Sequence, residues 1–129
     1  MRYNGAVTDA RSQLTVEDVH PGTSGATVLA LAGELDLGSI GALKEAVGHR
    51  LTGEANVVLD LVGLTFCDST GLGAFVALHR QAHSTGARFA LAAPRRRIAD
   101  LFTLSGIDQV ISVYDSVEAA LSAPPEAAK

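Results

Sequence analysis

The chain has 129 residues, of which 47% are hydrophobic and only 5% aromatic, with no tryptophan. This length fits one domain with a core of its own, which must be built from Ala, Val, Leu and Ile. The net charge of −4 at pH 7 disfavours nucleic acid and anionic membranes as partners. No apolar run approaches the roughly 20 residues that span a bilayer, and no secretory signal is expected at the amino terminus.

Cys67 is the single cysteine, so an internal disulfide is excluded, which suits a reducing cytosol. We therefore expect a cytoplasmic protein. The two ends have the composition of loose segments, with a polar start and an Ala- and Pro-rich finish. The expected organisation is a flexible segment over 1–12, one domain over 13–122 and a flexible tail over 123–129.

The first half of the chain predicts a hairpin followed by a helix. Alternating apolar residues predict an edge strand over 13–19, a turn over 20–25 and a fully apolar second strand over 27–32. Apolar residues then recur at helical spacing, and Gly53 is expected to end this helix. The inward positions predicted for it are Leu37, Ile40, Leu43, Val47 and Leu51.

The second half alternates strand and helix. An apolar run over 56–61 predicts a strand buried on both faces, followed by a short turn at Gly63. The remaining predicted elements are a helix from Asp68 to about Gly86, a strand over 88–93, a helix from Pro94 to Gly106, a strand over 110–114 and a helix over 117–123 capped by Ser116.

This order predicts an α/β fold in which a mixed, mostly parallel sheet of four to five strands packs with about four helices. Sites in such sheets gather at the carboxyl ends of the strands. Asp36 follows the second predicted strand and Ser69 follows the third, so we expect the two residues to meet there.

The most informative stretch is Asp68-Ser69-Thr70-Gly71, which joins a rigid strand to the start of a helix. A hydroxyl pair at a helix N-terminus is well placed to carry a phosphate, because free N–H groups and the helix dipole favour negative charge there. The same residue types are also typical helix caps, so Ser69 and Thr70 could serve only that structural purpose.

Three stretches together resemble a STAS domain, the fold of bacterial anti-sigma factor antagonists and of sulphate-transporter tails. They are Gly33-Glu34-Leu35-Asp36, the run from Leu59 to Asp68-Ser69-Thr70-Gly71-Leu72-Gly73, and Pro94 to Gly106. The resemblance covers about residues 14–121.

The resemblance implies a phosphorylation switch in transcription regulation. In stand-alone family members, the serine after the aspartate is phosphorylated by an anti-sigma factor that is also a serine kinase. The unphosphorylated antagonist binds this kinase and frees a sigma factor, phosphorylation releases the antagonist, and a serine phosphatase restores it. Carried over by position, the acceptor is Ser69. The implied partner-binding residues are Asp36, Asp68, Ser69, Thr70, Gly71 and Leu72.

Other interpretations stay open at this stage. One is a STAS subunit of a transport or scaffold complex, in which Ser69 only caps a helix. Another is a hydrolase using Ser69, although the Gly-x-Ser-x-Gly pattern is absent around it. We expect no enzyme, no cofactor and no metal site, and a monomer or weak dimer.

Two further groups are candidates for binding. His79 and His83 have a spacing that can hold a metal, but no third ligand is placed beside them. Arg95-Arg96-Arg97 is a solvated helix start or a site for a phosphate or an acidic partner. Cys67 is expected to fill a small buried apolar position.

Overall fold

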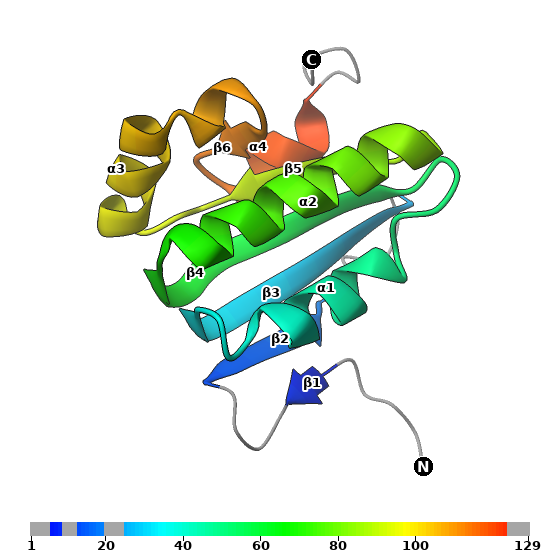
Figure 1. The fold of residues 1–129 in the computed structure, drawn as a ribbon. Helices are drawn as coiled ribbons and strands as arrows, with labels where there is room; N and C mark the ends of the chain where they lie inside the picture. Colours follow the sequence, from blue (N-terminus) through cyan, green and yellow to red (C-terminus); the bar gives the residue numbers. More distant parts are fainter. Residues whose placement is uncertain (1–5, 9–12, 20–24, 124–129) are drawn as a thin grey trace.

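The computed structural model describes residues 6–8, 13–19 and 25–123. Most of the predicted turn over 20–25, most of the predicted amino-terminal segment and residues 124–129 of the predicted tail lie outside this description. Figure 1 shows the arrangement, a twisted sheet with helices packed along it. The elements are β1 (Ala6–Thr8), β2 (Leu14–Asp18), β3 (Ala26–Leu35), α1 (Ile40–Gly48), β4 (Asn56–Cys67), α2 (Ser69–Thr85), β5 (Arg88–Ala92), α3 (Arg96–Ser105), the 3-10 helix η1 (Ile107–Gln109), β6 (Ser112–Tyr114) and α4 (Val117–Ser122).

The strands follow one another across the sheet in chain order, from β1 to β6. The neighbours β1, β2 and β3 are antiparallel, whereas β3, β4, β5 and β6 run parallel. The predicted hairpin and the mostly parallel α/β sheet are therefore confirmed. The strand count differs, because β1 is an additional strand inside the segment predicted to be flexible. Its three residues are too few to show an apolar period, and pairing with β2 gives the segment its extended structure.

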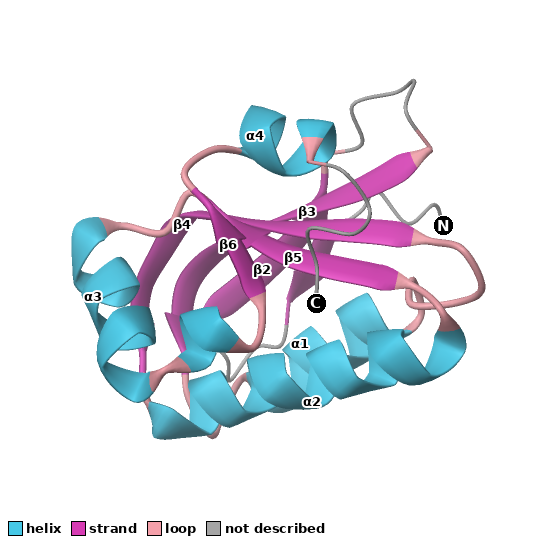
Figure 2. Ribbon diagram, turned by 90° about the horizontal axis from the view of Figure 1, so that it is seen from above, coloured by secondary structure: helices cyan, strands magenta, loops and turns pink. Residues whose placement is uncertain are grey.

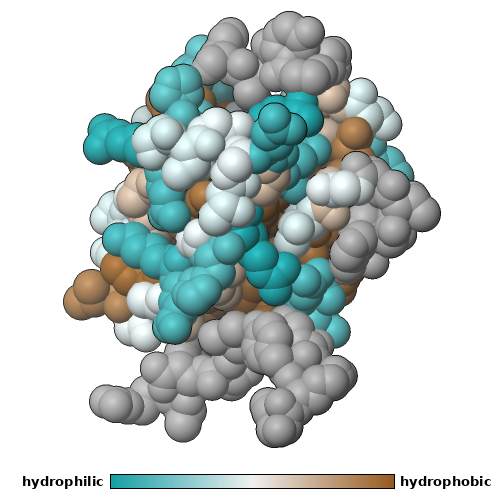
Figure 3. All heavy atoms as spheres, turned by 90° about the vertical axis from the view of Figure 1, so that its right-hand side faces the viewer, coloured by the Kyte–Doolittle hydropathy of each residue, from teal (hydrophilic) through white to brown (hydrophobic). Residues whose placement is uncertain are grey.

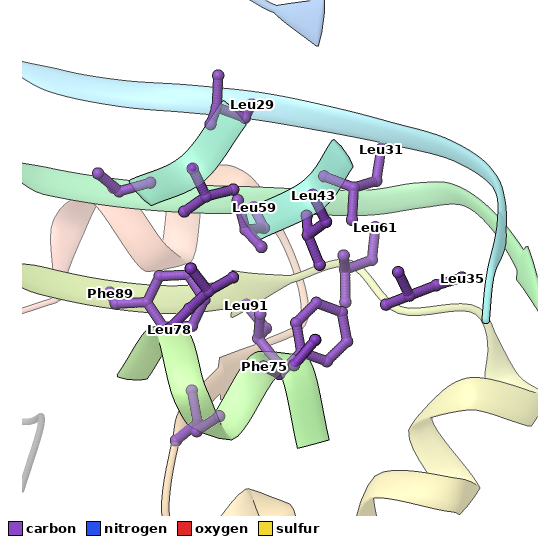
Figure 4. Packing of buried hydrophobic residues seen from close by; sticks show 14 of the residues in the cluster. Leu29, Leu31, Leu35, Leu43, Leu59, Leu61, Phe75, Leu78, Phe89 and Leu91 are labelled. Carbon is purple, nitrogen blue, oxygen red and sulfur yellow. The ribbon is translucent and has the colours of Figure 1, made fainter. Parts of the chain in front are cut away.

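Helices pack on both faces of the sheet, and α3 stands beside the end of β4 (Figure 2). α1 and α2 cover one face of the sheet and α4 covers the other, as Figure 2 shows. The main core fills the space between the sheet and the first two helices, where leucines from β3 and β4 meet Phe75 and Leu78 of α2 (Figure 4). A small second cluster under α4 contains Val28, Val58, Ala92 and Ala120. Aliphatic side chains supply most of both cores, as the composition predicts.

The predicted turn at Gly63 is wrong, because β4 continues through it to Cys67. Two residues of β4 lie opposite one of β3 at this point, since Asp60 pairs with Ala30 and Gly63 with Ala32. Such a β-bulge bends a strand without ending it. Glycine is needed here for close approach, because a Cβ on Gly63 would lie 2.8 Å from the carbonyl oxygen of Leu31.

The first helix is shorter than predicted at both ends. It begins at Ile40 rather than at Leu37, and its C-cap is His49 rather than Gly53. Leu37 was predicted to point inward, yet 75% of its surface is exposed. Hydrogen bonds fold residues 36–39 into a turn, which places Leu37 outside the helical period. Leu51 is buried as predicted, but from the loop that follows the helix.

The carboxyl-terminal half follows the prediction more closely. Gly86 is the C-cap of α2 and Gly106 is the C-cap of α3, each in the left-handed conformation that favours glycine. The Ser116 hydroxyl caps α4 by accepting from the N–H of Ala119 at 3.0 Å. The last strand is shorter than predicted, because η1 precedes it.

The amino-terminal ends of β3 and β4 lie at the right-hand side of Figure 1, which faces the viewer in Figure 3. That surface is mainly hydrophilic, with apolar side chains showing in small patches between polar ones. The carboxyl ends of β3 and β4 lie at the opposite side of the molecule, next to the start of α2.

Candidate functional site

The two turns predicted to meet do lie side by side. Leu35 and Cys67 pair as the last residues of β3 and β4. The N–H of Asp68 then donates to the carbonyl oxygen of Leu35 at 3.4 Å. Asp36 and Asp68 therefore follow paired positions at the carboxyl edge of the sheet, and the adjoining Ser69 begins α2.

Asp68 is the residue that caps α2. Its backbone is extended, and its Oδ1 accepts from the N–H of Gly71 at 3.0 Å. The N–H of Leu72 donates to the Asp68 carbonyl oxygen, which starts the helical ladder. An N-cap of this kind stabilises a helix by about 1 kcal/mol.

Ser69 is the first residue of α2 and is exposed. Within the described part of the chain, its hydroxyl makes no hydrogen bond and takes no part in capping. Thr70 follows it and is half-buried. The cap predicted for Ser69 or Thr70 therefore belongs to Asp68, and the Ser69 hydroxyl is left accessible to solvent.

Gly71 and Leu72 join this turn to the core. Gly71 is buried, and a Cβ at this position would lie 2.8 Å from the Cys67 sulfur and 2.9 Å from Cγ of Leu35. The missing side chain lets the first turn of α2 rest directly on the strand ends. Leu72 is half-buried and packs against the main core. Of these two predicted partner-binding residues, only Leu72 presents a side chain at the surface.

The turn after β3 is held by Ser39, whose exposed fraction is only 1%. Its hydroxyl accepts from the N–H of Asp36 at 3.0 Å and donates to the carbonyl oxygen of Glu34 at 2.9 Å. Oδ1 of Asp36 accepts from the N–H of Gly38. This network fixes the half-buried Asp36 beside the end of β4 and leaves Leu37 exposed.

Exposed apolar residues flank the site, and the sequence patterns did not predict them. Leu37 lies in the turn after β3, and Phe66, which is 46% exposed, lies near the end of β4. The sequence signal that could have placed Leu37 outside the helix is Ser39, two residues later. A serine at such a position can hold a turn through its hydroxyl instead of starting a helix.

A second register shift hid Phe66. Gly33 pairs with Leu64 but Glu34 pairs with Phe66, so the extra residue Thr65 breaks the alternation of inward and outward residues along β4.

Cys67 is buried, as predicted, beneath the first turn of α2. Burial, with a smaller contribution from the charge of Asp68, raises the pKa of its thiol to about 12. The thiol is therefore protonated at neutral pH, and a protonated thiol is a poor nucleophile. The role of Cys67 here is packing.

The arginine run lies at the start of α3. Arg95 donates from Nε to the carbonyl oxygen of Val62 at 2.8 Å, which fastens α3 to β4. Arg96 lies 3.7 Å from Asp100, one helical turn along. Arg97 makes no ion pair within the described ranges, and all three side chains are exposed.

Metal-binding clusters and membrane-spanning helices are both absent from the described part of the chain. Among residues 6–8, 13–19 and 25–123, no three His, Cys, Asp or Glu side chains gather where they could hold a metal ion. In the same part of the chain, none of the helices has both the length and the apolar character that crossing a membrane requires.

A family model of the STAS domain matches residues 18–120. The chain belongs to the STAS domain family. An anti-sigma-B factor antagonist from Staphylococcus epidermidis is 29% identical over 89 residues, which are 68% of this chain and 82% of that protein. A Thermotoga neapolitana relative is 29% identical over 69 residues, so the match spans 54% of this chain and 61% of the relative.

Solved structures of STAS proteins share the fold. The crystal structure of an anti-sigma factor antagonist from Mycobacterium paratuberculosis matches with a TM-score of 0.69 at 24% identity, over 90% of this chain and 97% of that one. The Bacillus cell fate determinant SpoIIAA, solved in its phosphorylated form, matches with a TM-score of 0.58 at 22% identity, over 82% and 95% of the two chains.

Proposed function

We propose that this STAS domain is a bacterial anti-sigma factor antagonist that is switched off by phosphorylation of Ser69. Unphosphorylated, it binds an anti-sigma factor with serine kinase activity, so that a sigma factor is released. Phosphorylation breaks this complex and a serine phosphatase restores the active form. The protein acts by binding and not by catalysis.

The observation that carries the proposal is that Asp68, and not Ser69, caps the start of α2. Asp68 caps the helix, so the exposed Ser69 hydroxyl has no structural duty within the described residues. A kinase can reach this hydroxyl without unfolding the helix. The STAS family match and the anti-sigma-B factor antagonist from Staphylococcus epidermidis support the same function.

The physics of the site favours a switch without refolding. A phosphate on Ser69 adds about −1.5 to −2 charges. The N-terminus of α2 stabilises negative charge by about 0.3–1 kcal/mol at an exposed position, so the fold should tolerate the group. Asp36 and Asp68 add negative charge beside it. Loss of fit and repulsion at the contact surface then release the partner.

The partner-binding surface on this proposal surrounds Ser69. It comprises Asp36 on the neighbouring turn, Thr70 and Leu72 on α2, and the cap residue Asp68. Gly71 contributes by letting α2 sit close to the strand ends and not by touching the partner, because it is buried.

A co-purification experiment in the source bacterium tests the proposal. Tagged Ser69→Ala should retain a serine kinase of the anti-sigma type, identified by mass spectrometry. Ser69→Asp should retain at least about tenfold less, equivalent to about 1.4 kcal/mol. Thr70→Ala is the matched control and should behave as the unmodified chain does. Equal recovery by the Ala and Asp variants, or a transporter in place of a kinase, would contradict the proposal.

A further inference from the structure

A groove lies between the end of β4 and α3, with a volume of about 380 Å³. This volume is within the range of small-molecule sites, which are mainly apolar with a few polar groups that orient the ligand. Of its eight lining residues, four are apolar and a fifth is the buried Cys67. The lining consists of Thr65, Phe66 and Cys67 from β4 and Arg97, Ile98, Asp100, Leu101 and Leu104 from α3.

The groove exists because β4 is longer than its neighbour. β5 pairs with β4 only as far as Asp60. The last residues of β4 are therefore bordered on this side by α3 instead of by a strand. Arg95 holds the start of α3 to the Val62 carbonyl oxygen, which fixes one end of the groove. Figure 2 shows α3 standing beside this end of β4.

The apolar wall of the groove is open to solvent. Phe66 is 46% exposed and Leu104 is 85% exposed. A ligand in the groove would therefore bury apolar area on both side chains. Neighbouring exposed apolar side chains at a concave site mark a binding surface.

The polar rim favours an anion. Arg97 lines the groove and has no ion pair within the described ranges, whereas Asp100, which also lines it, lies 3.7 Å from the Arg96 guanidinium. α3 also begins without a side-chain cap and without an acidic residue in its first turn. Free N–H groups at a helix start and an unpaired guanidinium both attract a carboxylate.

We propose that this groove binds a small amphiphilic anion, with an apolar body against Phe66, Leu101 and Leu104 and a carboxylate against Arg97. Medium-chain fatty acids have this chemistry. Two other hollows in the described part of the chain offer less. The one along β6, from Asp108 to Tyr114, follows an exposed strand edge, and the 200 Å³ hollow between α2 and α3 has no charged residue in its lining. The proposal stands independently of any phosphorylation at Ser69.

Decanoate and its neutral analogue decanol are the probes for this site. NMR titration of the whole chain should give saturable shifts of Phe66, Ile98 and Leu101 with decanoate, and binding of decanol should be at least about tenfold weaker. Absence of saturable shifts at these residues, or equal affinity for both probes, would overturn the proposal.

Two arginine variants separate a specific contact from general charge. Arg97→Gln should weaken decanoate binding about tenfold and leave decanol unaffected, because only the charge-assisted hydrogen bond is removed. Arg80→Gln is the control, since it removes an equal charge from an exposed side chain of α2 that does not line the groove, and its effect should stay within twofold. Equal losses in both variants would refute a site at Arg97.

Leu104→Glu tests the apolar wall without threatening the fold, because this side chain is almost fully exposed. A carboxylate there repels the ligand and removes apolar contact, so decanoate binding should fall at least tenfold. Unchanged binding would mean that decanoate sits elsewhere.

Discussion

At the scale of single residues, the site depends on which of three neighbouring polar side chains caps α2. Asp, Ser and Thr are all good N-caps, so the sequence could not choose between them. The backbone decides, because Asp68 is extended and Ser69 is already helical. The sequence identified the turn that starts α2, but it could not show which residue caps the helix and which hydroxyl is left without a hydrogen bond.

This division of roles predicts different stabilities for two alanine variants. Asp68→Ala should lower the free energy of unfolding by about 1 kcal/mol, because the Gly71 N–H loses its acceptor. Ser69→Ala should change it by less than about 0.5 kcal/mol, as for other exposed positions without contacts. Urea denaturation measures both. An equal loss in the two variants would mean that Ser69 shares the capping role.

Cys67 predicts a pH dependence of stability above pH 9. Its pKa is raised from the ordinary 9.0 to about 12 in the folded chain, so between these values the unfolded chain releases a proton that the folded chain keeps. Stability from this group is therefore intact below pH 9 and is lost as the pH rises toward 12, by up to about 1.4 kcal/mol per unit.

The measurement is the difference in unfolding free energy between the wild type and Cys67→Ala at pH 8, 9 and 10. Other groups titrating in this range are common to both chains and cancel. The wild type should lose stability relative to the variant between pH 9 and 10. A constant difference would show that the thiol is not held protonated.

At the scale of elements, α2 is the part that sequence patterns predicted best. The start predicted at Asp68 and the end predicted near Gly86 both agree with the structure. α1 was predicted less well, because Leu37 matched its period although the Ser39 hydrogen bonds impose a turn. The sequence could not reveal the continuation of β4 past Gly63, because a bulge depends on pairing with β3.

The close seating of α2 on the strand ends predicts opposite effects of alanine at two of its glycines. Gly71→Ala should cost about 1–3 kcal/mol, because the new methyl overlaps Cys67 and Leu35. Gly73→Ala should stabilise by about 0.5–1 kcal/mol, because its Cβ meets nothing within 4 Å and alanine is the better helix former. Thermal or urea unfolding compares them. A harmless Gly71→Ala would contradict the close contact.

At the scale of the whole molecule, the fold class and the meeting of two turns followed from strand and helix order alone. Parallel strands bring their carboxyl ends to one edge, so Asp36 and Asp68 had to be neighbours once β3 and β4 paired. The exposed apolar side chains and the groove beside α3 were not predictable in this way, because they depend on how far β4 extends beyond β5.

The proposed switch also belongs to this scale. The rigid core lies beneath the site, and the Ser69 hydroxyl projects from a helix that Asp68 already caps. A phosphate therefore changes the charge of one surface without needing a change of fold. On this account the signal is read by the partner and not by a rearrangement of the domain.

The most direct test of the account is intact-mass analysis and site mapping of the chain recovered from its native host, with Ser69→Ala and Thr70→Ala beside it. The account predicts one added phosphate on Ser69, absent from Ser69→Ala and retained by Thr70→Ala. A phosphate mapped to Thr70, or none under any growth condition, would contradict the assignment of Ser69 as the phosphoacceptor.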